Sequence, residues 1–284
     1  MKLFKLDHLM SDLLGGFATM LVALPASVAY GVAIFSAAGP NQAGFGALAG
    51  VIGAAALGLI APAFGGTRRL ITAPCAPAAA VLSAFVISAV HDGISVTTTL
   101  LMLSLLGLLA GVMQVLFGLL RLGRLIKYMP YPVVSGYLSG VGLIVIGSQL
   151  PKFLGITGGH SVWSALGSYD LWRWQGMTVG IVTIAVMLIT PKITKSVPGA
   201  ILGLAAGIAT YHGLALADPT LLVLKGNPFV IGVIGDGGSG DFLGSLDMRW
   251  NAVKDLSWHQ FKYVAVPALT LAVLLSIDTL KTCL

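Results

Sequence analysis

Long apolar runs, separated by short polar segments, dominate this chain and predict a bundle of membrane-spanning helices. A helix crosses the hydrocarbon core of a bilayer with about 20 mostly apolar residues. Eight runs approach that length, and the sixth of them is the shortest. The predicted spans are Leu14–Phe35, Gly44–Phe64, Leu70–Val90, Thr97–Leu120, Tyr128–Leu150, Gln175–Ile189, Val197–Leu216 and Tyr263–Leu284.

The basic residues of the short loops lie in alternate loops, which predicts the orientation of the helices. The loops Ser36–Ala43 and His91–Val96 contain no Lys or Arg. Because basic loops stay on the cytoplasmic side, we expect a cytoplasmic N-terminus and external segments at Pro151–Trp174 and Ala217–Lys262. As the location we expect the bacterial inner membrane. The basic loop residues are Lys2, Lys5, Arg68, Arg69, Arg121, Arg124, Lys127, Lys192 and Lys195.

The composition places the chain among membrane proteins and excludes several function classes. Charged residues make up 9% of the chain, whereas a soluble domain has about 25%. The net charge of +6 follows from the basic loops, so we expect no nucleic-acid partner. No nucleophile–base pair, histidine cluster or phosphate loop falls at one membrane depth. We therefore expect no enzyme, no catalytic residue and no cofactor other than a coupling ion.

The third predicted span has a first half that is unsuited to a helix. Pro74 and Pro77 each remove a backbone donor and disfavour helical conformation at the preceding residue. Irregular backbone at bilayer depth is tolerated only where protein or a watery cavity covers it. Discontinuous helices of this kind build the substrate sites of carriers, with a half-helix N-terminus that faces an anion.

If the helix restarts near Pro77, its first amides form an anion site without any basic side chain. Their positive end would point into a cavity, with the Cys75 thiol beside them. The alternative for Cys75 is a small apolar residue that fills space. The amides concerned are those of Ala76, Ala78 and Ala79.

Two more spans contain candidate site residues. In the first span, which also contains Tyr30, Pro25 removes a helical hydrogen bond and frees a backbone carbonyl, and small residues follow it. The alternative is a proline kink that serves packing alone. In the last span, Asp278 is spaced i,i+3 from Lys281 and i,i+4 from Thr282, so it shares a helix face with each. Ionisable residues inside a membrane are functional by default, and the alternative is an Asp278–Lys281 ion pair that holds helices together.

At these residues the chain resembles the SulP family of sulfate permeases and anion exchangers. Its matching blocks are Asp12–Phe17, Ala23–Ala33, Phe64–Arg68, Gly123–Gly140 and Ser276–Cys283. The resemblance implies an all-α inverted-repeat carrier of seven plus seven helices, in which a core domain moves against a gate domain. The third helix of each repeat is then a half-helix, and the two N-termini meet at the anion.

By this resemblance the chain holds the first repeat and the opening helix of the second. The expected divisions are a cytoplasmic N-terminus at 1–13, the first repeat at 14–216, an external loop at 217–262 and the first helix of the second repeat at 263–284. The cytoplasmic STAS domain that usually ends these proteins is not in the sequence. We expect the full-length protein to be a homodimer.

Within the family, the first-span pattern is closest to the sodium-dependent bicarbonate branch. The sulfate branch usually has Gln where this chain has Ala26. In the bicarbonate branch an Asp and a Thr one turn later bind sodium, and they match Asp278 and Thr282. That branch has Thr where this chain has Cys75.

The sequence therefore predicts secondary active transport of a small inorganic anion, with bicarbonate ahead of sulfate and sodium as the coupling ion. One alternative is proton-coupled or exchange transport of sulfate or a dicarboxylate, with Asp278 titrating or paired to Lys281. Another is a channel-like or structural membrane subunit. We assign the substrate site to Tyr30, Cys75, Ala76 and Ala78, and the cation site to Asp278 and Thr282.

Overall fold

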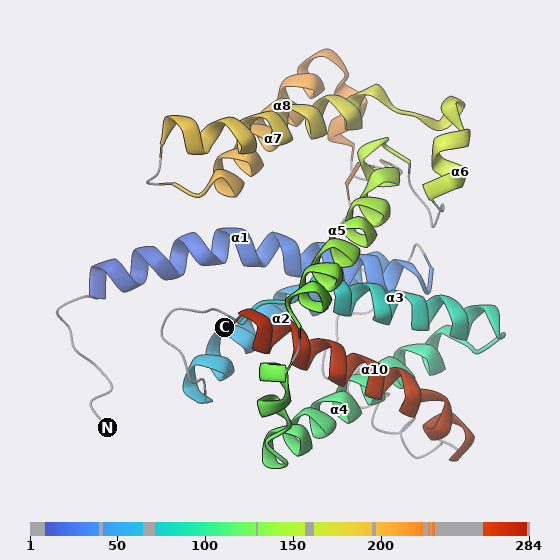
Figure 1. Cartoon of the computed structure of the whole chain (residues 1–284). Coiled ribbons are helices and arrows are strands. Elements are labelled where there is room, and N and C mark those ends of the chain that lie inside the picture. The colour runs from blue at the N-terminus through green and yellow to red at the C-terminus, as the bar shows by residue number, and fades with distance from the viewer. Residues whose placement is uncertain are drawn as a thin grey trace. The chain divides into compact units, whose positions relative to one another are not determined.

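A computed structural model describes residues 9–39, 42–64, 72–128, 130–156, 162–194, 197–223, 227, 229–230 and 258–282, and these form helices and their connections without a β-strand. Figure 1 labels these helices along the chain. The α-helices are α1 (Leu9–Ser36), α2 (Ala43–Phe64), α3 (Ala76–His91), α4 (Val96–Leu119), α5 (Tyr131–Phe153), α6 (Val162–Gly167), α7 (Trp174–Ile193), α8 (Gly199–Ala217) and α10 (Trp258–Thr282). Three 3-10 helices connect them, η3 (Leu122–Tyr128), η4 (Tyr169–Leu171) and η5 (Pro219–Leu222).

Each of the eight predicted spans coincides with a helix, and the differences lie at the ends. The shortest predicted span, Gln175–Ile189, is the 20-residue helix α7. It continues past Pro191 because the Thr194 amide still donates to the Thr190 carbonyl at 2.9 Å. Pro25 does not interrupt α1, which is continuous over 28 residues. By length and apolar composition, six of the described helices can cross a membrane, namely α1, α2, α4, α7, α8 and α10.

Several hydroxyl side chains in the described helices bond to their own helix. Each donates to the carbonyl oxygen four residues earlier, at 2.6 to 3.1 Å. Such bonds satisfy a polar group where no water is present, so these residues fit a bilayer without tertiary partners. They are Thr19, Ser27, Ser104, Thr178, Thr183, Thr190, Thr210, Thr270 and Ser276.

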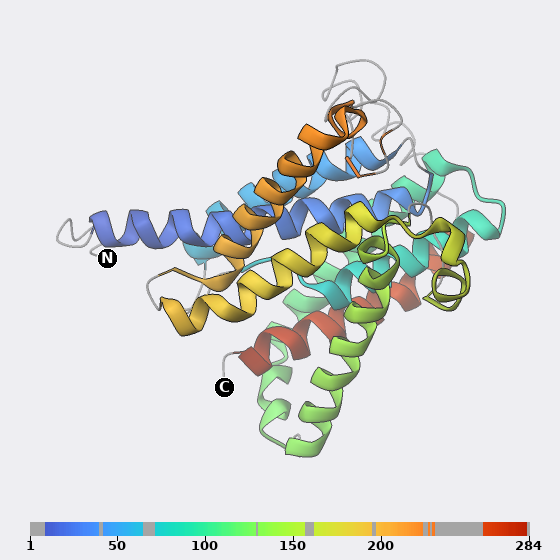
Figure 2. The same cartoon turned by 90° about the horizontal axis from the view of Figure 1, so that it is seen from above.

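The described chain divides into two compact units. One unit contains α3, α4 and α10 together with the adjoining parts of α1, α2 and α5. Its core lies where α10 packs on α4 and α3, and Figure 2 shows these three helices from a second direction. The buried core residues are Ala38, Phe85, Val86, Met102, Leu106, Ala110, Val264, Ala268, Leu271 and Ala272.

The other unit contains α7 and α8 together with the remaining parts of α1, α2 and α5. α7 and α8 pack along each other, and the α8 glycines Gly203 and Gly207 are buried at this contact. Lipid tails are as apolar as leucine, so helices in a bilayer associate through close packing of small residues. The Gly-x-x-x-Gly spacing on α8 allows that close approach.

Candidate functional site

The third helix starts where the proline pattern predicts an interruption. Residues 72–75 are non-helical, and Cys75 is the N-cap of α3 with φ −116° and ψ 147°. The helix begins at Ala76, one residue before the position expected from Pro77, because Pro is favoured in the first helical turn. With 16 residues, α3 is about 24 Å long, less than the roughly 30 Å of the hydrocarbon core.

Two of the three expected amides lack an acceptor within the helix. The Ala79 amide donates to the Cys75 carbonyl at 3.2 Å, so the expectation that it is free is wrong. It closes the first helical turn because it lies four residues after the N-cap. The amides of Ala76 and Ala78 precede that turn and have no intrahelical acceptor. Together with the helix dipole they make this end of α3 electropositive.

Tyr30 and Cys75 come together, although they are 45 residues apart in the sequence. Their side chains are both half-buried and lie close enough to interact electrostatically. Tyr30 belongs to the part of α1 that lies in the same unit as α3. Tyr30 therefore lies near the N-cap of α3, and its role in substrate binding stays a prediction.

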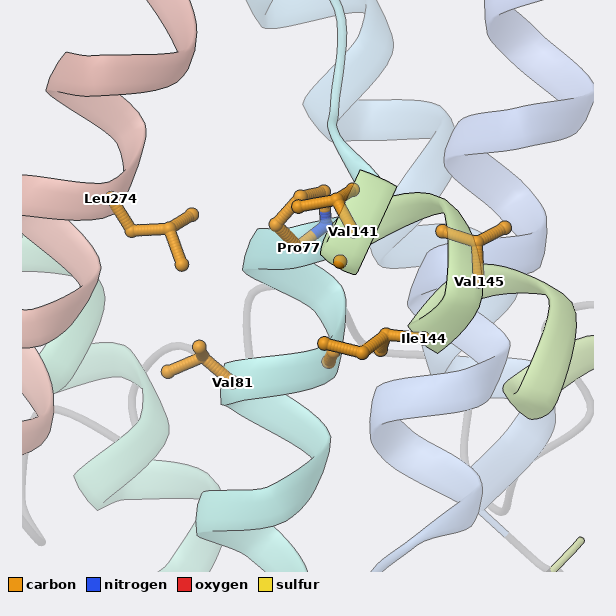
Figure 3. A pocket seen from close by; sticks show the side chains of 8 residues that line it. Pro77, Val81, Val141, Ile144, Val145 and Leu274 are labelled. Atoms are coloured by element: carbon orange, nitrogen blue, oxygen red, sulfur yellow. The ribbon is translucent and has the colours of Figure 1, made fainter. Parts of the chain in front are cut away.

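A cavity of about 280 Å³ lies against the first two turns of α3. Figure 3 shows that side chains of α3, α5 and α10 converge on it. Its lining is apolar, and Ala76 and Ala78 are not among the residues that line it. The lining residues are Pro77, Ala80, Val81, Gly140, Val141, Ile144, Val145 and Leu274.

The α5 side of this cavity was not predicted from the sequence. A signal was present, because the block Gly123–Gly140 that resembles the family ends at a glycine that lines the cavity. A Cβ atom added at Gly140 would meet no atom within 4 Å. The apolar residues after it have no chemistry of their own and give no separate signal.

The predicted cation-site residues lie near the end of α10. Asp278 is half-buried, one turn after the cavity residue Leu274. Lys281 and Thr282 belong to α10, and their side chains lie outside the described part of the structure. Because α10 is helical through Thr282, Asp278 and Thr282 have the helical spacing that places them on one face. Their role as sodium ligands stays a prediction.

Several sequence-level features lie outside the described residues. These are the N-terminal segment 1–8, the basic turn at 65–69, most of the expected external loop and Cys283. Among the described residues, no group of three or more His, Cys, Asp or Glu side chains is arranged to hold a metal ion.

Comparison with known proteins gives one family. Residues 9–283 match the model of the sulfate permease family. The bicarbonate transporter BicA of Picosynechococcus sp. is 38% identical over 154 residues, covering 52% of this chain and 25% of the relative. BicA of Synechocystis sp. is 39% identical over 152 residues, covering 52% of this chain and 24% of the relative.

Sulfate transporters are also similar to this chain. The chloroplastic sulfate transporter 4.1 of Arabidopsis thaliana is 25% identical over 199 residues, covering 67% of this chain and 27% of the relative. The chain thus spans about a quarter of the length of these relatives. No solved structure matches it.

The family match covers nearly the whole chain, and the apolar helices agree with it. The chain is an all-α, multi-pass integral membrane protein, and it belongs to the sulfate permease family.

Proposed function

We propose that this chain forms part of a secondary active carrier that moves bicarbonate into a bacterial cell together with sodium. The observation that supports this most is the interrupted third helix, whose first amides have no helical acceptor, in a member of the sulfate permease family. The protein would lie in the plasma membrane with its N-terminus in the cytoplasm.

Bicarbonate is favoured over sulfate by the comparisons. The two relatives named bicarbonate transporters are 38% and 39% identical over half of this chain. A relative named a sulfate transporter is 25% identical over two thirds of it. The alternative substrate is sulfate or a dicarboxylate, moved by proton coupling or exchange.

In this proposal the anion binds at the start of α3. The amides of Ala76 and Ala78 donate to its oxygens, and the Tyr30 hydroxyl and Cys75 thiol border the same place. Two amides and a helix dipole supply partial positive charge without a counter-ion that would have to be displaced. A singly charged anion is matched better by this modest charge than a doubly charged one.

The coupling ion binds at Asp278 and Thr282 on α10. A carboxylate at bilayer depth costs on the order of 3 kcal/mol, and a bound sodium ion removes much of that cost. A cation there also favours an anion nearby, because local charge sets the energy of the second ion. Coupling between the two sites is reciprocal, so bicarbonate tightens sodium binding by the same factor.

The test is the variant Asp278→Asn in the complete gene product, reconstituted in proteoliposomes. We expect bicarbonate uptake to lose its sodium stimulation, because the amide keeps the shape of the side chain and removes its charge. Asp170→Asn is the control, since Asp170 is an exposed carboxylate in η4. Sodium stimulation that persists undiminished in Asp278→Asn would defeat the sodium-coupled proposal. Uptake that depends on a pH gradient and not on sodium would favour the alternative, which is proton-coupled or exchange transport.

A further inference from the structure

A hydrogen bond joins the start of α10 to the end of α3, and no sequence motif predicts it. The Tyr263 hydroxyl donates to the Asp92 carboxylate Oδ2 at 2.8 Å, across 171 residues of sequence. The Tyr263 ring also packs against Phe85 of α3, with the ring centroids 5.8 Å apart. Tyr263 is thus held to α3 both by its ring and by its hydroxyl.

Asp92 projects from a backbone that is firmly held. It is the C-cap of α3, and the chain after it forms a closed helix terminus. The Gly93 amide donates to the Val90 carbonyl at 3.1 Å. The Ile94 amide donates to the Ala89 carbonyl at 3.0 Å. With Gly93 at φ +78°, these bonds form a Schellman motif. The motif fixes the backbone from which the Asp92 carboxylate extends.

The start of α10 needs such a contact more than an uninterrupted helix would. Pro267 lies inside α10 and has no amide to donate to the Tyr263 carbonyl four residues earlier. The first two turns of α10 are therefore less firmly joined to the rest of the helix. A tertiary bond at Tyr263 compensates for that missing backbone bond.

The position of this bond determines which residues of α3 and α10 lie at the same height along the two helices. α3 and α10 run in opposite directions (Figures 1 and 2). Pro77 lies 15 residues before Asp92 on α3. Asp278 lies 15 residues after Tyr263 on α10. At 1.5 Å per residue each distance is about 22 Å, so Asp278 comes to the depth of the first turn of α3.

The cavity gives an independent check of this register. Val81 of α3 lies 11 residues before Asp92, and Leu274 of α10 lies 11 residues after Tyr263. Both line the same cavity, and Figure 3 shows them facing each other across it. The antiparallel register set at one end therefore persists over three helical turns.

We propose that Tyr263 and Asp92 are a positioning pair, whose hydrogen bond sets the depth of Asp278 against the amide end of α3. The effect of this pair on transport rests on the proposed function, in which the α3 amides bind the anion and Asp278 binds the cation. Neither Tyr263 nor Asp92 touches either ion. They act by keeping the two sites at the same depth, so that a charge at one site changes the electrostatic energy of an ion at the other.

The register is tested first, without any transport measurement. Cysteine is placed at Val81 and, in separate variants of the complete gene product, at Thr270, Leu274 or Ile277, with the native cysteines replaced by serine. These three α10 residues line one groove, so they share a face and differ in height by about one turn each. We expect the Leu274 pair to cross-link most. The added substitution Tyr263→Phe keeps the ring against Phe85. We expect it to change the yield of the Thr270 and Ile277 cross-links, relative to that of the Leu274 cross-link, by about fivefold, which is the effect of losing one hydrogen bond.

The effect on coupling is tested second, in sodium-stimulated bicarbonate uptake. We expect Tyr263→Phe and Asp92→Ala each to raise the half-saturating sodium concentration by about fivefold, the lower end of typical coupling between sites. The double variant should add nothing more. Asp92→Asn keeps an acceptor oxygen and should retain most of the coupling. His91→Gln is the matched control, because His91 is exposed and its Nδ1 lies 3.9 Å from Asp92 Oδ1, the oxygen that does not accept from Tyr263.

The two measurements separate failure of this inference from failure of the proposed function. An unchanged cross-link ratio in Tyr263→Phe would overturn the positioning role. A normal half-saturating sodium concentration in both single variants would also overturn it. If the wild-type protein shows no sodium stimulation but the cross-link ratio shifts as expected, the proposed function fails and the register role stands.

Discussion

Gly207 on α8 provides a quantitative test of how closely α7 and α8 pack. A Cβ atom added there would lie 2.5 Å from Thr183 Oγ1 on α7, well inside the roughly 3.5 Å at which non-bonded heavy atoms begin to attract. The Thr183 hydroxyl cannot rotate away without cost, because it donates to the Val179 carbonyl at 2.7 Å. The variant Gly207→Ala must therefore move the helices apart or break that bond.

The expected cost follows from these two routes. Overpacking of a well-packed contact costs about 1–3 kcal/mol, and loss of the Thr183 bond costs about 1 kcal/mol. Alanine returns up to about 1 kcal/mol through its higher helix propensity. We expect Gly207→Ala to destabilise the protein by about 1–2 kcal/mol. Gly213→Ala on the same helix meets no atom within 4 Å and should be neutral or stabilising.

The assay is thermal unfolding of the purified complete protein in detergent, followed by tryptophan fluorescence. Thr183→Ala provides a rescue, because the next Thr183 atom, Cβ, would lie 3.7 Å from the new methyl group, an ordinary contact. Gly207→Ala should therefore cost less in the Thr183→Ala background than in the wild type. Equal unfolding midpoints for Gly207→Ala and Gly213→Ala, or a failure of the rescue, would refute the close packing described for this pair.

Two more substitutions test a second close approach and a left-handed backbone position. Gly50→Ala should destabilise the protein by about 1–3 kcal/mol, because its Cβ would lie 2.8 Å from the Ser27 backbone carbon, whereas Gly53→Ala has open space; equal unfolding midpoints would contradict the contact. Gly93→Ala should cost about 1 kcal/mol, because Gly93 has φ +78° and a side chain is strained there. Gly93→Asn should cost less, and the same unfolding assay would contradict the reasoning if Ala were tolerated better than Asn.

The sequence predicts the helices well because a bilayer leaves few alternatives. Each backbone polar group in lipid must bond within its own helix, so a run such as Thr97–Leu120 becomes α4 with almost the same ends. The end of α7 was harder to place. Pro191 suggests an earlier stop, yet the Thr190 carbonyl still accepts a helical hydrogen bond beyond it.

The start of α3 was predictable from Pro74 and Pro77, since proline acts on the backbone locally. The Ala79 expectation was wrong because the helix begins at Ala76 rather than at Pro77, which gives the Ala79 amide an acceptor. The Tyr263–Asp92 bond could not be predicted in this way, because it joins residues 171 positions apart. Only the packing of α10 against α3 brings them together.

We propose that this member of the sulfate permease family is part of a carrier that moves bicarbonate with sodium, using the amide end of α3 and Asp278. The most direct measurement is uptake of labelled bicarbonate and labelled sulfate into proteoliposomes that contain the complete gene product, with and without a sodium gradient. We expect saturable bicarbonate uptake that rises with the sodium gradient and exceeds sulfate uptake. Sulfate uptake that ignores sodium, with no bicarbonate uptake, would contradict the proposal.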